Sequence, residues 1–346
     1  MKIKLALADV NEEYIERFIA IIKEKENIMV SVFTDRDALA EAVQSQNFDI
    51  LLFSSSIDIT GINLRKIAIS ILLYDDNTDE FDKYGKYAKI NKYQRGTSII
   101  NQMLDMYSDI SKSEQWSGNS TSRTRTVSVY SPVGGSGKTT IALSLASLIA
   151  NRGFRVMYIN FETISSYGAF LKQDGGKSMG EIIAGLDKKI NVPLKIKSII
   201  KTDPRGIIYF EEFSSIFDME EITDEDIDKL IGAVSEADVC DYIIIDTDSA
   251  YDRKTRKILE ISELNVIVSD GSGFGSYKMK KFMEQYSRDA DAMAKTYAVH
   301  NFGNDDPSIG MLISLGTIPY LNGYPFDKSI EHICRNVGLA VDVLLR

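Results

Sequence analysis

A glycine-rich segment at residues 131–140, SPVGGSGKTT, constrains the fold of this chain more than any other stretch of its sequence. It follows the apolar run Val127–Tyr130 and leads into an apolar helical pattern over Thr139–Asn151. Glycines allow backbone N–H groups to turn inward, and the first turn of a helix adds partial positive charge. The order strand, glycine loop, helix therefore predicts a phosphate-binding loop. The alternative is a purely structural part, in which the glycines only form a tight turn.

Each residue of this loop has an expected part in binding a nucleoside triphosphate. We expect Lys138 to reach the β and γ oxygens and to support catalysis, Thr139 to ligate Mg²⁺, and Thr140 to hydrogen-bond the α-phosphate. The residues expected to contact the nucleotide are Gly134, Gly135, Ser136, Gly137, Lys138, Thr139 and Thr140.

An aspartate far downstream offers the second part of the site. Asp246 ends the apolar run Tyr242–Ile245, which has the pattern of a strand covered on both faces. A carboxylate at the end of a neighbouring parallel strand can hold the water shell of Mg²⁺. A lone aspartate at a strand end is common, so the prediction that Asp246 serves the metal through water depends on its pairing with the loop.

Strand and helix patterns alternate on both sides of a polar segment, Ser108–Thr126, which is rich in Ser and Thr and shows no period. Such a segment cannot bury enough apolar surface to fold alone. At 346 residues the chain also exceeds the usual size of one domain. We therefore expect an α/β protein with two doubly wound parallel-sheet domains, residues 1–108 and 126–346, joined by a linker at 109–125.

The expected elements follow from the periodicity of apolar residues. In the first domain we expect strands at Ile3–Ala8, Met29–Phe33, Ile50–Phe53, Ala68–Tyr74 and Lys86–Ile90, and helices at Glu12–Lys25, Arg36–Ser45 and Thr97–Tyr107. In the second domain we expect strands at Val127–Tyr130, Val156–Asn160, Ile207–Phe210, Tyr242–Asp246, Val266–Ser269 and Tyr297–Asn301, with helices between them.

Composition narrows the class of partners. A net charge of −10 argues against broad attraction to DNA or to anionic lipid, and no specific nucleic-acid partner is expected. The two cysteines, Cys240 and Cys334, lie far apart, which fits a reducing compartment. Neither a cleavable signal peptide nor an apolar run long enough to span a bilayer is visible. We therefore expect a cytoplasmic protein.

The loop together with two further stretches resembles the MinD/ParA class of ATPases. SPVGGSGKTT is similar to the deviant Walker A motif of that class, Cys240–Asp248 to its second phosphate motif, and Ile318-Pro319-Tyr320 to the stretch that lines its adenine pocket. The resemblance covers Thr126 to the C-terminus. It implies ATP and Mg²⁺ as ligands and a homodimer with ATP between the two chains.

The N-terminal domain narrows the resemblance further. Residues Met1–Ser108 resemble the receiver fold, which is flavodoxin-like, and a receiver-like domain joined to a MinD/ParA-type ATPase points to the TadZ/CpaE group. That group is associated with pilus-secretion machinery at the cell pole. The resemblance thus implies protein partners in such an assembly, reached through the N-terminal domain. It also implies recruitment to the pole or to the inner face of the membrane.

Two departures from the class pattern bear on catalysis. The class usually has Gly-Lys where this chain has Pro132-Val133, and that lysine crosses the dimer to the γ-phosphate of the partner. Cationic fingers supply about 10³–10⁵ in rate, so hydrolysis is expected to be slow. Asn160 and Glu162 stand where the class has two aspartates. Glu162 could orient the attacking water or lie on a surface loop without a catalytic part.

The adenine end of the site rests on the resemblance alone. It implies that Asn301 reads the base and that Pro319 and Tyr320 pack beside it. Asn is also common at strand ends for its local hydrogen bonds, so a structural part for Asn301 stays open.

The receiver-like domain lacks the residues for phosphorylation. A receiver needs an acidic pair, an acceptor aspartate and a lysine; Asp9 and Lys92 match, but Ser54 stands at the acceptor position and Tyr93 replaces the usual proline. A serine hydroxyl has neither the charge nor the metal affinity of a carboxylate. We expect an interaction module without phosphoryl transfer, with Asp58 and Asp49 as fallback acceptors.

Two functions remain in competition. In the first, ATP acts as a latch that holds a scaffolding dimer. In the second, the protein is a cycling ATPase of the partitioning or cell-division type, in which Lys172, Lys177 or an arginine replaces the missing lysine. The last helical pattern, Asp327–Val337, carries few lysines, so direct membrane insertion through the tail is not expected.

Overall fold

The computed structural model describes residues 2–23, 27–75, 83–111, 124–188, 190–322, 325 and 328–345. The chain divides into two compact units. The first comprises Met1–Trp116 with Lys189–Ser198, and the second comprises Ser117–Lys188 with Ile199–Arg346. Most of the expected linker, residues 112–123, lies outside the described residues.

The first unit is built on a five-stranded sheet in which every pairing is parallel. Its strands are β1 (Ile3–Ala8), β2 (Ile28–Phe33), β3 (Phe48–Ser54), β4 (Ile67–Tyr74) and β5 (Ala88–Asn91), in the spatial order β2-β1-β3-β4-β5. This is the strand order of flavodoxin-like folds, whose ligands bind where the order reverses, between β1 and β3. The expected receiver-like architecture is confirmed.

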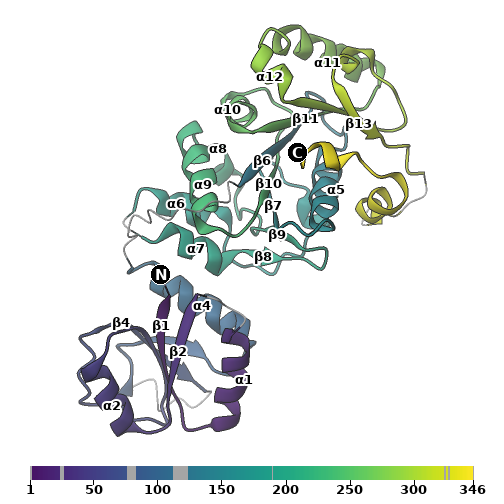
Figure 1. Ribbon diagram of the computed structural model, residues 1–346. Helices are drawn as coiled ribbons and strands as arrows, with labels where there is room; N and C mark the ends of the chain where they lie inside the picture. The colour runs from purple at the N-terminus through teal and green to yellow at the C-terminus, as the bar shows by residue number, and fades with distance from the viewer. Residues whose placement is uncertain are drawn as a thin grey trace. The chain divides into compact units, whose positions relative to one another are not determined.

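Helices cover both faces of this sheet (Figure 1). They are α1 (Glu12–Lys23), α2 (Arg36–Ser45) and α4 (Gly96–Ser108). Phe18 of α1 and Met103 of α4 pack on the face that carries Leu52, while Leu39 of α2 packs with Phe53 on the other face. The expected extension of α1 to Lys25 lies outside the described residues.

A helix from much later in the chain belongs to the first unit. It is α7 (Val192–Ile199), most of which lies in the segment grouped with the receiver-like fold. The ammonium group of Lys195 is buried and lies 2.8 Å from carboxylate oxygens of both Asp105 and Asp109. The backbone N–H of Asn191 donates to the carbonyl of Ser108 over 3.0 Å. Periodicity alone gave no sign of this association.

The second unit is built on an eight-stranded sheet. Its strands are β6 (Arg125–Tyr130), β7 (Val156–Asn160), β8 (Lys201–Thr202), β9 (Ile207–Tyr209), β10 (Tyr242–Asp246), β11 (Leu264–Ser269), β12 (Thr296–His300) and β13 (Ile313–Thr317). The spatial order is β13-β12-β11-β6-β10-β7-β9-β8, and only the pairing of β8 is antiparallel. The six expected strands are confirmed within a residue or two of their expected ends.

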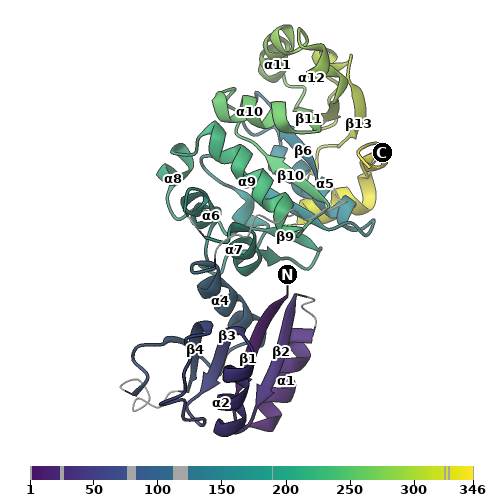
Figure 2. The same cartoon turned by 60° about the vertical axis from the view of Figure 1, so that its left-hand side comes forward.

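Helices again lie on both faces. They are α5 (Lys138–Ala150), α6 (Met179–Leu186), α8 (Ile216–Glu220), α9 (Asp224–Ala237), α10 (Arg253–Ile261), α11 (Gly273–Tyr286), α12 (Ala290–Ala294) and α13 (Ser329–His332). Figure 2 shows α9 and α10 on one side of the sheet and α5 on the other. Helix α5 is buried nearly all round, because its side chains fill the core that the strands share with the C-terminal segment.

The helical pattern expected at the C-terminus, Asp327–Val337, is helical from Ser329 to Val337 in the described chain. Residues 326–327 lie outside the described chain; from Ser329 the helix α13 runs to His332 and continues as a π-helical turn over Ile333–Val337. Its buried side chains Ile330 and Ile333 pack on the core around α5. Among the described residues, no helix is both long and apolar enough to cross a bilayer.

Candidate functional site

The glycine loop connects the end of β6 to the start of α5. Gly137 caps the helix in a left-handed conformation, with φ of 89°, and no side chain in the described chain accepts a hydrogen bond at this end. A β-carbon on Gly137 would lie 2.3 Å from Nδ2 of Asn301, so only glycine fits. The first N–H groups of α5 therefore stay available, and helix N-termini of this kind bind anions.

The lysine and threonine that follow are buried at the foot of the loop. The ammonium group of Lys138 donates to the hydroxyl of Ser249 over 2.7 Å. The hydroxyl of Thr139 lies 3.3 Å from a carboxylate oxygen of Glu162. The loop thus holds a cation and a hydroxyl inside the protein, next to a carboxylate, as the sequence predicts for a phosphate and metal site.

Asp246 lies fully buried at the end of β10, directly beside Asn160 at the end of β7. One of its oxygens, Oδ2, accepts from the hydroxyl of Tyr158 over 2.8 Å and from the amide of Asn160 over 3.2 Å. Within the described chain its other oxygen, Oδ1, is buried without a hydrogen-bond partner, and so is the hydroxyl of Ser136 in the loop. Burial, followed by the charge of Glu162, raises the pKa of Asp246.

These two oxygens without partners indicate whether the site fits a metal-bound nucleotide. A buried polar atom without a partner costs about 1–3 kcal/mol, and such atoms are expected where a ligand completes the site. Mg²⁺ is commonly held by one or two carboxylates together with water and phosphate oxygens. In the described chain no group of three or more His, Cys, Asp or Glu side chains could hold a metal alone. The residues therefore fit a metal that arrives with its phosphates.

Glu162 joins the two halves of this cluster. One of its carboxylate oxygens lies within 3.4 Å of Thr139, Asn160 and Ser166, and its backbone N–H donates to the side-chain oxygen of Asn160 over 3.1 Å. Glu162 therefore does not extend into solvent as a surface-loop residue would. The structure places it against the residue expected to ligate Mg²⁺.

The residues expected at the adenine end differ in burial and in hydrogen bonding. Asn301 is buried; its amide nitrogen donates to the carbonyl of Ser136 over 2.8 Å, and its oxygen accepts from the N–H of Phe302. Its polar atoms thus support the loop itself. Tyr320 is exposed, with its ring 5.7 Å from that of Phe302, and Pro319 precedes it beside Gly303.

The position of the missing lysine holds a buried aliphatic side chain. Val133 is buried in the loop, and its backbone N–H donates to the hydroxyl of Ser131. The two lysines considered as replacements both face acids: Lys172 lies 2.8 Å from Asp174, and Lys177 lies 3.9 Å from Glu181.

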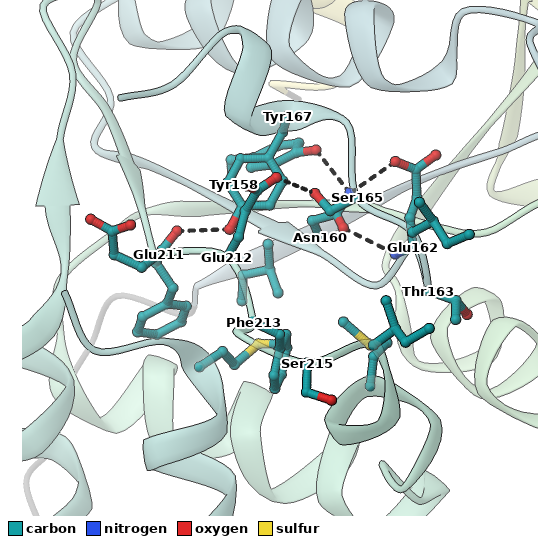
Figure 3. A pocket seen from close by; sticks show the side chains of 16 residues that line it. Tyr158, Asn160, Glu162, Thr163, Ser165, Tyr167, Glu211, Glu212, Phe213 and Ser215 are labelled. Atoms are coloured by element: carbon teal, nitrogen blue, oxygen red, sulfur yellow. Dashed lines mark hydrogen bonds between the residues drawn. The ribbon is translucent and has the colours of Figure 1, made fainter. Parts of the chain in front are cut away.

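A cavity of about 210 Å³ opens beside the cluster (Figure 3). Tyr158, Asn160 and Glu162 lie on one side of it, with Phe213 and Ser215 on the other. Within this wall Tyr167 donates to the carbonyl of Phe210 over 2.9 Å. Sequence reasoning missed both the cavity and the part of Tyr158; the only signal was a tyrosine two residues before Asn160 in a buried strand.

The receiver-like unit has its own polar cavity, also of about 210 Å³, at the ends of β1 and β3. The ammonium group of Lys92 lies 2.5 Å from a carboxylate oxygen of Asp9, and the hydroxyls of Ser54 and Ser56 bond to each other. Tyr93 is exposed. The three residues expected to meet at this position, Asp9, Ser54 and Lys92, all line the cavity.

The fallback acceptors are engaged elsewhere. The carboxylate of Asp58 pairs with Lys83 over 3.1 Å and accepts from the N–H of Thr60. Asp49 accepts from the N–H of Lys4 over 2.7 Å. Neither residue lines the cavity of the receiver-like unit.

Comparison with known proteins agrees with both folds. Residues 1–108 match the family described as TadZ-like, receiver domain, and residues 124–295 match an AAA domain family. A ParA family ATPase from Chlorobium tepidum TLS has a similar solved structure, with 17% identity and a TM-score of 0.52, over 65% of this chain and 99% of that one. No curated protein sequence matches the chain.

Two further solved structures are similar at lower scores. A plasmid partition protein from Borrelia burgdorferi B31, bound to AMPPNP, is 17% identical, with a TM-score of 0.48 over 64% of this chain and 98% of that one. The septum site-determining protein MinD from Pyrococcus horikoshii OT3, complexed with Mg-ADP, is 16% identical. Its TM-score is 0.46 over 57% of this chain and 82% of that one.

The fold and the loop define the class of the second unit, which is a P-loop ATPase domain of the MinD/ParA type. In this chain that domain follows a TadZ-like receiver domain, residues 1–108. The resemblance drawn from the glycine loop and from the N-terminal fold is confirmed.

Proposed function

We propose that this protein binds ATP with Mg²⁺ and that the bound nucleotide holds two copies together as a scaffold for a pilus or secretion assembly. The main observation that supports Mg-ATP as the ligand is the fully buried Asp246. Its Oδ1 has no hydrogen-bond partner in the described chain, and it lies in a cluster with Thr139 of the loop. A nucleotide-bound cation would lower the cost of that buried charge.

The residues divide the work of binding. The N–H groups of residues 134–140 surround the phosphates, Lys138 neutralises the β and γ oxygens, and Thr139 ligates the metal. Asp246 holds the metal through water. When bound, the metal spreads the charge of the phosphates and makes the γ-phosphate more electrophilic. The adenine end is the least supported, because the side-chain amide of Asn301 is already engaged with the loop.

Slow hydrolysis is part of the proposal. Val133 cannot carry charge to a partner's γ-phosphate, and Lys172 and Lys177 face acids of their own chain. Glu162 lies against Thr139, where a carboxylate could orient water, so turnover is expected to be weak and not absent. The alternative is a cycling ATPase, in which some other cation completes the site.

The receiver-like domain supports the scaffolding part. In its cavity Asp9 pairs with Lys92 and Ser54 stands at the acceptor position, which supports a use of the domain in binding protein partners. The expected domain bounds of 1–108, 109–125 and 126–346 stay part of this proposal. So do a cytoplasmic location and recruitment to a pole or to the inner membrane face through partners.

The test is prolonged incubation of the purified protein with Mg-ATP, followed by sedimentation and analysis of the bound nucleotide. We expect dimers that retain intact triphosphate. Lys138→Ala serves as the blank, and Val133→Lys is the sharpening variant, expected to raise turnover by up to about 10³-fold if only this cation is missing. A sedimentation profile unaffected by ATP would contradict the latch, and rapid conversion to diphosphate by the wild type would favour the cycling ATPase.

A further inference from the structure

The side chain of Lys138 is held by a hydroxyl group from a distant part of the chain. Its ammonium group donates to Oγ of Ser249 over 2.7 Å, which is the one hydrogen bond of this side chain among the described residues. Lys138 is buried, and Ser249 is half-buried. Ser249 follows Asp246 in the turn that leaves β10. The sequence patterns of the loop and of the strands gave no part to this serine.

The turn that carries Ser249 is fixed to the strand that leads into the glycine loop. Thr247 is fully buried, and both its N–H and its hydroxyl donate to the carbonyl of Val129 in β6, the hydroxyl over 2.8 Å. The hydroxyl of Tyr130 lies 3.4 Å from the carbonyl oxygen of Ser249. The N–H of Ser249 donates to the carboxylate of Asp248 over 2.6 Å. These bonds give Ser249 a defined place relative to the loop.

The carboxylate of Asp248 adds negative charge to the surroundings of Lys138. Burial raises the pKa of Asp248. Hydrogen bonds from Ser249 and Thr163, followed by the charge of Lys138, outweigh burial and hold that pKa below its usual value. The turn therefore carries a negative charge at neutral pH, which favours the charged form of the lysine next to it.

The bond to Ser249 leaves Lys138 able to bind phosphate. An ammonium group has three N–H donors and no acceptor. With one donor directed to Ser249, two remain for the β and γ oxygens of a nucleotide. A hydroxyl oxygen carries no formal charge, so it orients the ammonium group without neutralising it. The carboxylate of Asp9, in contrast, neutralises the Lys92 that it pairs with.

We propose that Ser249 is a positioning residue of the nucleotide site, whose hydroxyl orders the side chain of Lys138 before the triphosphate binds. The inference deepens the proposed function, on which it rests, because it names the residue that prepares the phosphate-binding cation. A long side chain loses rotamer freedom when a ligand fixes it, and a side chain that is already fixed loses less. Ser249 thus acts on nucleotide affinity through Lys138.

The test measures nucleotide affinity in full-length variants by calorimetric titration with ATP. Ser249→Ala removes the hydroxyl, and Ser249→Cys replaces it with a group that is only a weak acceptor. Both variants are expected to bind ATP about 2–10-fold more weakly than the wild type does. Ser249→Thr keeps a hydroxyl and is expected to restore wild-type affinity. Unchanged affinity in Ser249→Ala would overturn the inference, and so would tighter binding, which would mean that the hydroxyl competes with phosphate for the lysine.

A matched control removes a serine hydroxyl that lies away from the loop. Ser262 is buried just before the amino end of β11, and its hydroxyl donates to the carbonyl of Ile258 over 2.7 Å. The glycine loop, in contrast, follows the carboxyl end of β6. Ser262→Ala is therefore expected to keep wild-type affinity for ATP. An equal loss of affinity in Ser262→Ala and Ser249→Ala would mean that both act through the fold, against the inference.

Combining Ser249→Ala with Lys138→Ala gives the decisive result. Because the hydroxyl acts through the lysine, its removal from a Lys138→Ala chain is expected to change ATP affinity by less than about twofold. Direct contact between Ser249 and the nucleotide would give a different outcome, in which Ser249→Ala weakens binding equally with and without the lysine. That outcome would contradict the positioning of Lys138.

Titrations with and without Mg²⁺ separate this inference from a part for Ser249 in the metal site and from the proposed function. Ser249→Ala is expected to weaken ATP binding by the same factor in both conditions. A loss that appears only with Mg²⁺ would make Ser249 a metal-site residue and refute its action through Lys138. A wild type that binds no nucleotide would contradict the proposed function itself. A wild type that binds ATP no better than Ser249→Ala does would remove only the positioning residue.

Discussion

Each of the two units has a polar cluster at the carboxyl ends of the strands of its parallel sheet. The two clusters differ in whether their charged side chains pair with each other. In the receiver-like unit, Lys92 and Asp9 pair with each other, with 12% and 1% of their side chains exposed. In the ATPase unit, Asp246 is buried with one oxygen unpaired, and Lys138 meets only the hydroxyl of Ser249 among the hydrogen bonds of its side chain in the described chain. One cluster is complete without a ligand and the other is not.

This difference in pairing distinguishes a cluster that stabilises the fold from a cluster that binds a ligand. Breaking a buried ion pair leaves a charge without compensation, which is costly to the folded state. Asp246 is already costly to the folded state, because it is buried with hydrogen bonds from the uncharged Tyr158 and Asn160 to one oxygen and, in the described chain, none to the other. Exchanging it for an uncharged side chain therefore costs the metal-free protein little. Matched substitutions in the two clusters should therefore have opposite effects on stability and on nucleotide binding.

The largest expected effects come from the two lysines. Lys92→Ala is expected to destabilise the receiver-like unit by about 3–5 kcal/mol, because Asp9 stays buried without its cation. Lys138→Ala should leave stability nearly unchanged and weaken ATP binding by about 10–150-fold, the value of a charge-assisted hydrogen bond. Thermal unfolding and calorimetric titration with Mg-ATP measure the two effects. If Lys92→Ala weakened nucleotide binding in a chain that remained folded, the division between the clusters would fail.

Exchanging each carboxylate for its amide sharpens the comparison. Asp246→Asn is expected to remove the advantage that Mg²⁺ gives to nucleotide binding, about tenfold or more. Asp9→Asn is expected to leave nucleotide binding intact and to destabilise its unit by depriving Lys92 of its partner. Titrations with and without Mg²⁺ decide this, and equal Mg²⁺ dependence in Asp246→Asn and the wild type would argue against the metal site.

The same substitution carries a pH dependence. Burial and then Glu162 raise the pKa of Asp246 to about 7, so the folded metal-free protein binds this proton more tightly than the unfolded chain does. Its contribution to stability is therefore lost as pH rises from about 4 towards 7. Asp246→Asn should lack this component of the pH profile. If the free energy of unfolding had the same pH dependence in the wild type and in Asp246→Asn between about pH 4 and 7, the raised pKa of Asp246 would be contradicted.

A smaller effect is expected from the tyrosine that holds Asp246. Burial, together with Asp246, raises the pKa of Tyr158, which keeps its hydroxyl a donor. Tyr158→Phe should weaken Mg-ATP binding by about fivefold, since one hydrogen bond contributes about 1 kcal/mol. The control is Tyr167→Phe, which removes a buried hydroxyl from the same cavity without touching Asp246. If both variants lost the same Mg-ATP affinity, the hydrogen bond from Tyr158 to Asp246 would have no specific part in binding.

The smallest effect is expected at Ser54. Its hydroxyl bonds only to the neighbouring Ser56 among the contacts described, so Ser54→Ala should change neither nucleotide binding nor stability by more than about 0.5 kcal/mol. Incubation with acetyl phosphate should label neither protein. Labelling of the wild type that disappears in the Ser54→Ala variant would return a phosphoryl function to the receiver-like unit.

Local patterns predicted much of this architecture, because phosphate loops and buried parallel strands are set by short stretches of sequence. The loop at residues 134–140 and Asp246 lie at the strand ends expected for them, and Asp9, Ser54 and Lys92, which were matched to receiver positions, line one cavity. Strands β8 and β13 escaped detection, since β8 has two residues and β13 includes Gly316 at φ of 145° beside an irregular register. Both are edge strands, where pairing depends on the neighbour more than on local pattern.

Features made by distant segments could not be predicted. The ion pairs of Lys195 with Asp105 and Asp109 join helices far apart in sequence. The hydrogen bond from Tyr158 to Asp246 depends on the register of β7 against β10, which no local period encodes. Asn301 was expected to read a base, but its contacts with the loop depend on the same long-range packing.

Calorimetric titration of the full chain with Mg-ATP tests the central comparison most directly. The account predicts one nucleotide per chain in the wild type, the same in Lys92→Ala wherever that variant stays folded, and loss of binding in Lys138→Ala over the same concentration range. Binding that survives Lys138→Ala unchanged, or that disappears with Lys92→Ala while the chain remains folded, would contradict it.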